Sequence, residues 1–257
     1  MDFRRFAQEI RPAVYEAGKI ALKHFQKITA ERKEDRSYVT IADREVERFL
    51  REEIRSRFPE HGFIGEETGG DVEGKELVWA VDPIDGTAPF VYELPVWAVS
   101  VGLVSREGCM VGFVYLPVLD DLFWNIAGEP AYLNEREIRV HDPVNFGRES
   151  TIMMPSSRMP ECDCRYEGRG FAFGSAASTV CFVANGKLHG GLIDPIRIWD
   201  IAGGNAILKA AGGDMRYLSG REVDLWELRT GIKTPEVIAI GHPQNVEQLR
   251  KLFVMKK

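Results

Sequence analysis

The sequence predicts a layered α/β or α+β fold. Apolar side chains recur every three or four residues from about 3 to 27, which is the spacing of an amphipathic helix. Short apolar and β-branched runs bounded by Gly, Pro and Asp follow between residues 62 and 126, as in strands joined by turns. Helical patterns return from residue 175 onward. Helices before, between and after many strands indicate alternating layers of the two.

Two N-terminal helices are expected to cover one face of the sheet. The apolar stripe of the first helix comprises Phe3, Phe6, Ile10, Val14, Ala17, Ala21 and Phe25. The second helix begins near Thr40, whose hydroxyl can cap it, and ends near Phe58. Five strands are predicted next, over residues 62–65, 77–81, 96–104, 110–116 and 121–126. The later elements are helices at 175–184, 200–211 and 245–253 and strands at 188–193 and 237–240.

Length and composition favour a single unit. No Pro- or Ser-rich linker divides the 257 residues, so we expect one domain over 1–257 with a soft boundary near 140–150. A formal net charge of −6 argues against a nucleic-acid partner held mainly by phosphate contacts. No apolar run approaches the length of a membrane span, and no secretory signal precedes the first helix. We therefore expect a cytoplasmic protein without a membrane partner.

The four cysteines do not form a recognisable framework. Cys109 and Cys181 are isolated, and the only close pair is Cys162 and Cys164, in a C-x-C arrangement. Zinc sites and disulfide frameworks need other spacings, so we expect reduced thiols. A metal or redox role for the close pair stays open.

One hexapeptide carries the most chemistry. Asp82-Pro83-Ile84-Asp85-Gly86-Thr87 places two carboxylates three residues apart after an apolar, strand-like stretch. Pro83 fixes one backbone angle and disfavours helix at the residue before it. Both carboxylates and the Ile84 carbonyl can therefore converge on one point. Oxygen ligands of this kind suit a hard cation such as Mg²⁺.

Other acids lie at the ends of predicted elements. Glu66 and Glu67 follow the first predicted strand, and Asp200 opens a helix of small residues. A Glu-Glu pair is usually a solvated surface pair, and an Asp at a helix start usually only caps it. Their occurrence together with the hexapeptide favours a shared site, because α/β sites assemble where strands end and helices begin.

These motifs together resemble the inositol monophosphatase family of Mg²⁺-dependent phosphomonoesterases, within the superfamily that includes fructose-1,6-bisphosphatases. Further matches fall in order along nearly the whole chain, at residues 39–43, 95–100 and 174–177. The resemblance implies a layered α-β-α-β-α sandwich, hydrolysis of a small phosphorylated substrate and a homodimer.

The resemblance also implies two metal positions. Glu66, Asp82 and the Ile84 carbonyl would hold one ion, while Asp82, Asp85 and Asp200 would hold a second. Asp82 would bridge the two. Mg²⁺ is the expected ion, at two or three per site, with Mn²⁺ as a substitute. The neighbouring Glu67 would join a more weakly held third ion.

Substrate contacts are implied by position in the same way. The amides of Gly86 and Thr87 would face the phosphate from a helix N-terminus, where partial positive charge favours an anion. Asp200 would also contact the substrate. The residues expected to line the pocket for the alcohol portion are Gly174, Ser175 and Ala176, of which Ser175 also suits a helix N-cap.

The reaction expected by resemblance is in-line attack of water, without a covalent enzyme intermediate. Thr87, hydrogen-bonded to Asp43, would orient or deprotonate that water together with Glu66. By its position alone Asp43 would be interpreted as an exposed helix acid, so its catalytic role depends on the resemblance.

The chain also departs from its relatives. Ala88 stands where many members have Thr, and Ile193 stands seven residues before Asp200, where inositol-preferring members commonly place a Glu. Asp194 is one residue out of register with that Glu. Inositol specificity is therefore in doubt, and we expect a permissive phosphatase.

Three alternatives stay open: a fructose-1,6-bisphosphatase, a histidinol-phosphate phosphatase and a catalytically silent relative. Arg32, Lys33 and Arg197 are candidates for binding a second anionic group, although solvated charge is their ordinary interpretation. If they face the pocket, fructose-1,6-bisphosphate or histidinol phosphate becomes a plausible substrate. The third alternative, a catalytically silent metal-binding relative, is disfavoured because the expected ligands are all present.

Overall fold

The computed structural model describes residues 1–257 except 28–30, 33–37, 156–161 and 257. The side chains of Arg32, Lys33 and Cys162 lie outside the described part, so the predictions made for them stay predictions. None of the described helices is long and apolar enough to cross a membrane. The single-domain organisation and the homodimer also stay predictions.

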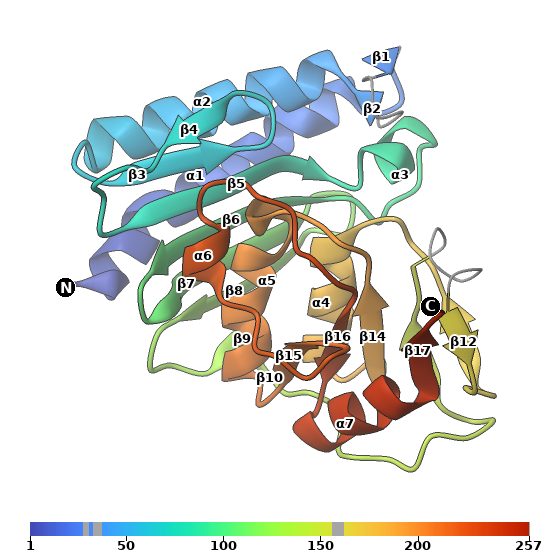
Figure 1. Cartoon of the computed structure of the whole chain (residues 1–257). Coiled ribbons are helices and arrows are strands. Elements are labelled where there is room, and N and C mark those ends of the chain that lie inside the picture. The colour runs from blue at the N-terminus through green and yellow to red at the C-terminus, as the bar shows by residue number, and fades with distance from the viewer. Residues whose placement is uncertain (28–30, 33–37, 156–161, 257) are drawn as a thin grey trace.

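Two long helices form the outermost layer, as predicted (Figure 1). They are α1 (Phe3–His24) and α2 (Ile41–Arg57). The hydroxyl of Thr40 accepts a hydrogen bond from the Ala42 amide, and the Asp43 carboxylate accepts one from the Thr40 amide, at 3.1 and 2.8 Å. This reciprocal arrangement is a capping box, which starts α2 at Ile41. The apolar faces of both helices are buried against the first sheet.

The first sheet has eight strands in the order β10-β9-β8-β7-β6-β5-β3-β4. Only β3 and β5 pair in parallel; the other pairs are antiparallel. In chain order the strands are β3 (Gly62–Gly65), β4 (Gly69–Asp71), β5 (Val78–Asp85), β6 (Ala98–Ser105), β7 (Gly108–Leu116), β8 (Asp121–Ile126), β9 (Ala131–Leu133) and β10 (Arg136–Ile138).

Strand β5 extends further than the sequence predicted. We expected a strand ending at Val81 and a turn after it, whereas β5 continues to Asp85. Its register with β6 shifts between Asp82 and Asp85, where Pro83 offers no N–H to the ladder. The strand therefore carries both aspartates of the hexapeptide to its end.

The middle layer consists of α4 (Ala176–Ala184) and α5 (Ile198–Ala210), both close to their predicted bounds. Helix α5 lies almost directly on β6 and β7, because glycines meet at the contact. A Cβ at Gly112 would lie 2.4 Å from the carbonyl oxygen of Gly203, and a Cβ at Gly102 would lie 2.7 Å from the Cβ of Ala202. Any larger side chain at these positions would push the helix off the sheet.

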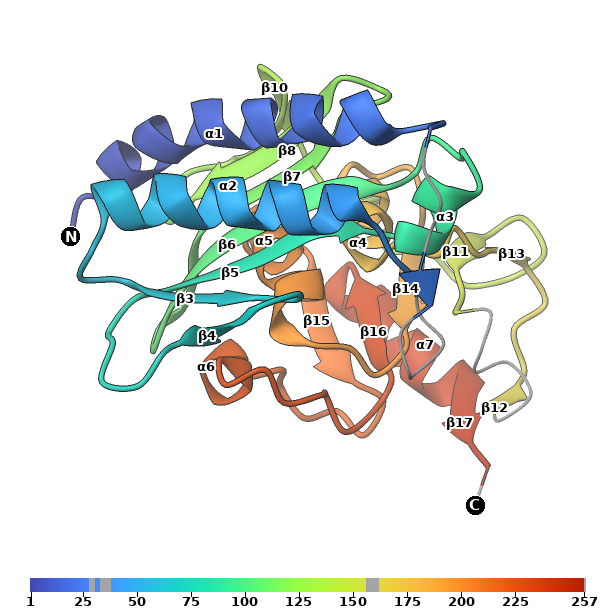
Figure 2. The same ribbon diagram turned by 90° about the horizontal axis from the view of Figure 1, so that it is seen from above.

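A second, five-stranded mixed sheet and a final helix complete the chain (Figures 1 and 2). The sheet has the order β13-β11-β14-β16-β15. Its strands are β11 (Thr151–Met153), β13 (Arg169–Phe171), β14 (Gly190–Ile193), β15 (Asp214–Tyr217) and β16 (Ile238–Gly241). Helix α7 (Pro243–Leu252) covers its outer face, where a third apolar cluster is buried. The layers thus run helix, sheet, helix, sheet, helix, which confirms the predicted sandwich.

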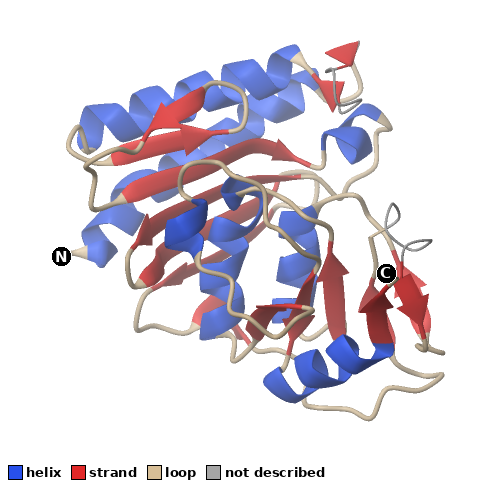
Figure 3. Cartoon of the chain, viewed as in Figure 1, coloured by secondary structure: helices blue, strands red, loops and turns tan. Residues whose placement is uncertain are grey.

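Several short elements were not predicted. Besides the edge strands given above, they are β1 (Glu31–Arg32), β2 (Tyr38–Val39), β12 (Cys162–Cys164), α6 (Leu225–Leu228) and β17 (Phe253–Met255), whereas α3 (Thr87–Val91) begins at the helix N-terminus expected at Gly86 and Thr87. Each has five residues or fewer, which is too short for apolar periodicity to reveal. Two pairs of short strands at the right of Figure 3, β1 with β2 and β12 with β17, form small sheets of their own.

The close contact between α5 and the sheet gives a first prediction. Gly112→Ala should destabilise the fold by about 1–3 kcal/mol, the usual effect of overpacking. Gly147→Ala is the matched control, because no atom lies within 4 Å of a Cβ built there, and it should change stability by less than about 0.5 kcal/mol. Urea denaturation of both variants measures this, and equal stabilities would contradict the packing argument.

Candidate metal and phosphate site

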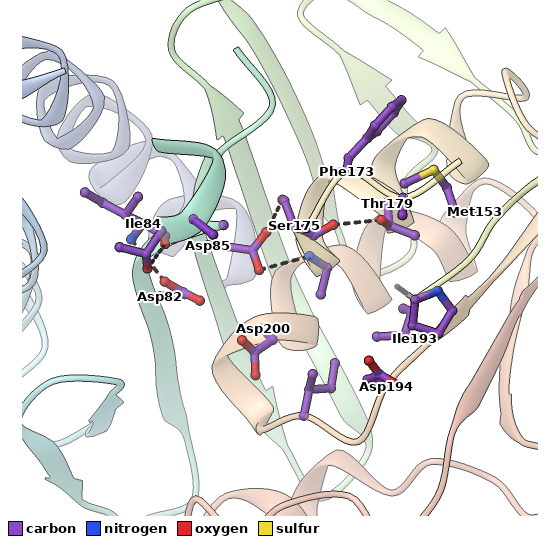
Figure 4. A pocket seen from close by; sticks show the side chains of 18 of the residues that line it. Asp82, Ile84, Asp85, Met153, Phe173, Ser175, Thr179, Ile193, Asp194 and Asp200 are labelled. Carbon is purple, nitrogen blue, oxygen red and sulfur yellow. Dashed lines mark hydrogen bonds between the residues drawn. The ribbon is translucent and has the colours of Figure 1, made fainter. Parts of the chain in front are cut away.

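Three aspartates from two elements meet at one place. Asp82 and Asp85 lie at the end of β5, and Asp200 lies in the first turn of α5. One carboxylate oxygen from each lies within 4.8 Å of those of the other two. Figure 4 shows the three side chains on the same side of the cavity.

Neighbouring backbone groups orient two of these carboxylates. Asp82 Oδ1 accepts a hydrogen bond from the Ile84 amide at 3.0 Å. Asp200 Oδ2 accepts one from the Arg197 amide at 2.7 Å. Each contact spans only two or three residues, so the local chain conformation fixes the direction of both side chains.

Asp85 is held instead by the N-terminus of α4. It accepts hydrogen bonds from the amides of Ala176 and Ala177, at 3.1 and 2.9 Å, and from the Ser175 hydroxyl. Ser175 also caps the helix by accepting from the Ser178 amide at 3.1 Å, so its predicted N-cap role is confirmed. A carboxylate at a helix N-terminus is favoured by the unpaired amides there. Asp85 therefore joins the first sheet to the middle helical layer.

The electrostatics of the cluster favour a bound cation. Burial, together with the charges of neighbouring carboxylates, raises the pKa of Asp85 to about 6 and that of Asp200 to about 8. Burial and the charges of Glu66, Asp85 and Asp200 hold the pKa of Asp82 well above its ordinary range. A divalent cation would relieve this repulsion, and a ligand set made only of oxygen suits Mg²⁺. The residues present therefore fit the expected metal.

A cavity of about 410 Å³ adjoins the cluster. Ten of the residues predicted for metal or substrate contact line it, namely Glu66, Asp82, Ile84, Asp85, Gly86, Thr87, Gly174, Ser175, Ala176 and Asp200. Glu66 lies outside the tight group formed by the three aspartates. Glu67 does not line the cavity. The described residues that line the cavity include no Lys, Arg or His.

The far wall of the cavity is apolar apart from Thr179 and Asp194, and sequence reasoning missed most of it. Figure 4 shows Met153, Phe173 and Ile193 opposite the acidic cluster. Leu192 and Ile196 also line the cavity. These residues come from β11, from β14 and from segments before α4 and α5, so no single motif could reveal them. Only Ile193 was singled out, by its distance from Asp200.

Asp43 and Thr87 are placed differently from expectation. Asp43 is fully buried, not exposed as its position alone suggested, and burial raises its pKa to about 7. Its Oδ2 accepts from the Thr40 hydroxyl at 2.6 Å, while its Oδ1 has no hydrogen-bond partner. The Thr87 hydroxyl donates to the Ile84 carbonyl at 3.3 Å. The expected bond from Thr87 to Asp43 is therefore absent, because the Thr87 hydroxyl donates to the Ile84 carbonyl instead.

Arg197 does not line the cavity. Its Nη1 donates to the Gly231 carbonyl, and its guanidinium carbon lies 5.6 Å from the centre of the Trp199 ring. The suggestion that it binds a second anionic group is not supported by this placement.

Glu47 is the main buried polar residue near the site that the sequence reading did not single out. Its carboxylate is fully buried beside the turn that carries Glu66. A signal was available, since Asp43 and Glu47 lie on the same face of α2 as the apolar Val46, Leu50 and Ile54. Two acids on a buried helix stripe need partners.

Comparison with known proteins supports the motif argument. The sequence model of the inositol monophosphatase family matches residues 4–253. A protein of Aquifex aeolicus described as fructose-1,6-bisphosphatase/inositol-1-monophosphatase is 33% identical over 225 residues, covering 82% of this chain and 85% of the relative. The Thermotoga maritima IMPase structure superposes with a TM-score of 0.82 at 27% identity, over 98% of this chain and 96% of that one. SaIMPase-II of Staphylococcus aureus, solved with 2′-AMP bound, has a TM-score of 0.78 at 28% identity, over 98% and 94%.

The raised pKa values predict how stability depends on pH in chelator-treated protein. Folding raises the pKa of Asp200 from near 3.8 to about 8, so the folded state binds more protons than the unfolded state between these values. The free energy of unfolding should therefore fall as the pH rises from about 4 to about 8. Asp200→Asn should flatten this slope, and the exposed Glu52→Gln should not. Denaturant titrations at pH 5 and pH 8 measure it, and an unchanged slope in Asp200→Asn would contradict the assignment.

Proposed function

Since the chain belongs to the inositol monophosphatase family of phosphomonoesterases, we propose that it hydrolyses small phosphomonoesters with Mg²⁺ by direct attack of water. The observation that supports this proposal is the group of three aspartates, two buried and one half-buried, whose oxygens lie within 4.8 Å of one another beside the cavity. A catalytically silent relative is disfavoured, because Glu66 and Thr87 also line that cavity. A homodimer, as in the family, is part of the proposal.

The proposed metal ligands are those that the cavity brings together. Asp82, Asp85 and Asp200 would hold one ion, and Glu66, Asp82 and the Ile84 carbonyl would hold another. When bound, such ions neutralise phosphoryl charge and make water nucleophilic near neutral pH. Asp85 contributes a fixed orientation, because α4 already donates three hydrogen bonds to it.

Proton transfer would involve Asp43, Thr87 and Glu66. A pKa near 7 lets Asp43 exchange a proton at neutral pH, and its Oδ1 has no hydrogen-bond partner. The expected bond from Thr87 to Asp43 requires the Thr87 hydroxyl to leave the Ile84 carbonyl. Glu66, which lines the cavity, would orient the attacking water together with Thr87.

The cavity wall supports a broad choice of alcohol. Its apolar part, with Met153, Phe173 and Ile193, suits a planar or aliphatic group better than a ring of hydroxyls. The staphylococcal relative has been solved both with 2′-AMP and with inositol monophosphate bound, which supports a broad choice of alcohol. A second phosphate would find no Lys, Arg or His among the described lining residues, so a bisphosphate is the weaker candidate. We therefore propose a permissive monophosphatase.

Metal dependence tests the reaction. Chelation should abolish phosphate release, and Mg²⁺ or Mn²⁺ should restore it. Asp82→Asn should lower turnover by about 10²–10⁴, because it removes a charge shared by two ions and placed at the reacting phosphate. Asp163→Asn, at an exposed position of β12, is the control and should retain full activity. Full turnover in excess chelator would overturn the proposal.

Substrate choice tests the permissive reading. Inositol 1-phosphate, 2′-AMP, histidinol phosphate and fructose-1,6-bisphosphate should be compared by kcat/KM. We expect the monophosphates to fall within about two orders of magnitude, because one missing hydrogen bond costs only about 0.5–1.5 kcal/mol. Ile193→Glu should raise the relative kcat/KM for inositol 1-phosphate, whereas Ile193→Leu should not. A preference for inositol 1-phosphate above about a thousandfold in the unmodified enzyme would refute this reading.

A further inference from the structure

The turn that carries Glu66 is held by a buried carboxylate from another layer. Glu47 of α2 has no exposed surface. Its Oε2 accepts a hydrogen bond from the Glu67 amide at 2.7 Å, and its Oε1 accepts one from the Thr68 amide at 2.9 Å. The Thr68 hydroxyl donates to the same Oε1. Three donors on consecutive residues after Glu66 therefore converge on one side chain.

Arg51, one helical turn after Glu47, makes further contacts with the same turn. Its Nη2 lies 3.6 Å from Glu47 Oε1 and donates to the Gly69 carbonyl at 2.7 Å. Its guanidinium carbon lies 4.2 Å from the centre of the Phe63 ring in β3. The charge of Glu47 is thus balanced inside the protein, and both ends of the turn between β3 and β4 are attached to α2.

The sequence of the turn is adapted to this carboxylate. A Cβ at Gly65 would lie 2.4 Å from Glu47 Cδ and 2.6 and 2.7 Å from its two oxygens. The carboxylate therefore occupies the space that any side chain at position 65 would take. Gly65 and Glu47 are complementary, one providing the space and the other filling it.

We propose that Glu47 is a positioning residue that holds the turn so that Glu66 stays beside Asp82 at the cavity. Glu66 lines the cavity, and its charge contributes to the raised pKa of Asp82. Its backbone is one residue from the first amide that Glu47 binds. Loss of the hydrogen bonds to Glu47 would let Glu66 move away from Asp82 while leaving the three aspartates in place. The proposal rests on the proposed function only in taking Glu66 as a metal ligand.

The test is Mg²⁺ binding to the whole protein without substrate, measured by calorimetry. Glu47→Gln keeps the volume but turns an NH₂ group toward one of the amides, and it should weaken Mg²⁺ binding by about 10–100-fold, as loss of a ligand's supporting partner typically does. Hydrogen exchange of residues 65–69 should quicken at the same time. Glu52→Gln, at an exposed position on the same helix, should change neither quantity.

A double-mutant cycle separates positioning from general stability. If Glu47 acts through Glu66, Glu47→Gln should add little to the loss of Mg²⁺ affinity already caused by Glu66→Gln. Gly65→Ala disturbs the same contact from the other side and should reproduce the effect. It also serves as the second variant if Glu47→Gln fails to fold.

The outcomes distinguish the two proposals. Failure of the unmodified protein to bind Mg²⁺ would overturn the proposed function. Normal Mg²⁺ binding by Glu47→Gln or by Gly65→Ala, in a protein that binds the ion otherwise, would overturn the positioning role alone. Additive losses in the cycle would do the same, since they would show that Glu47 acts independently of Glu66.

Discussion

The mutual repulsion of buried carboxylates is the constraint on which the rest of this structure depends. Asp82, Asp85 and Asp200 are held close together where burial already disfavours their charge. Such a group persists only if the surrounding fold supplies the energy to hold it. Backbone amides of β5, of α4 and of Arg197 just before α5 do so locally. The close contact of α5 with the first sheet keeps the two sources of acids together.

Parts of this arrangement could be predicted from the sequence because their signals are local. The stripe of α1, the cap at Thr40 and the two acids around Pro83 each depend on residues within a few positions of one another. The position of Asp200 at a helix start was visible for the same reason. All of these features are present in the structure.

Other parts could not be predicted, because they depend on contacts between distant segments. Asp43 is buried because α2 packs on the first sheet. Inside the protein, the amide and hydroxyl of Thr40 donate hydrogen bonds to its carboxylate in place of water. The attachment of Asp85 to α4 joins residues about ninety positions apart. The continuation of β5 to Asp85 depends on pairing with β6, which no local pattern in the hexapeptide reveals.

The cavity draws its two walls from different layers, and this has a consequence for how the molecule can change. Asp82, Asp85 and Thr87 belong to the end of β5 and the segment after it, whereas Met153 and Ile193 belong to the second sheet. Substitutions in the second sheet can therefore alter which alcohol is accepted without disturbing the groups that hold the phosphate. A lineage of such proteins can diversify its substrates through the strands of the second sheet, while the end of β5 and the first turn of α5 pass on the reaction unchanged.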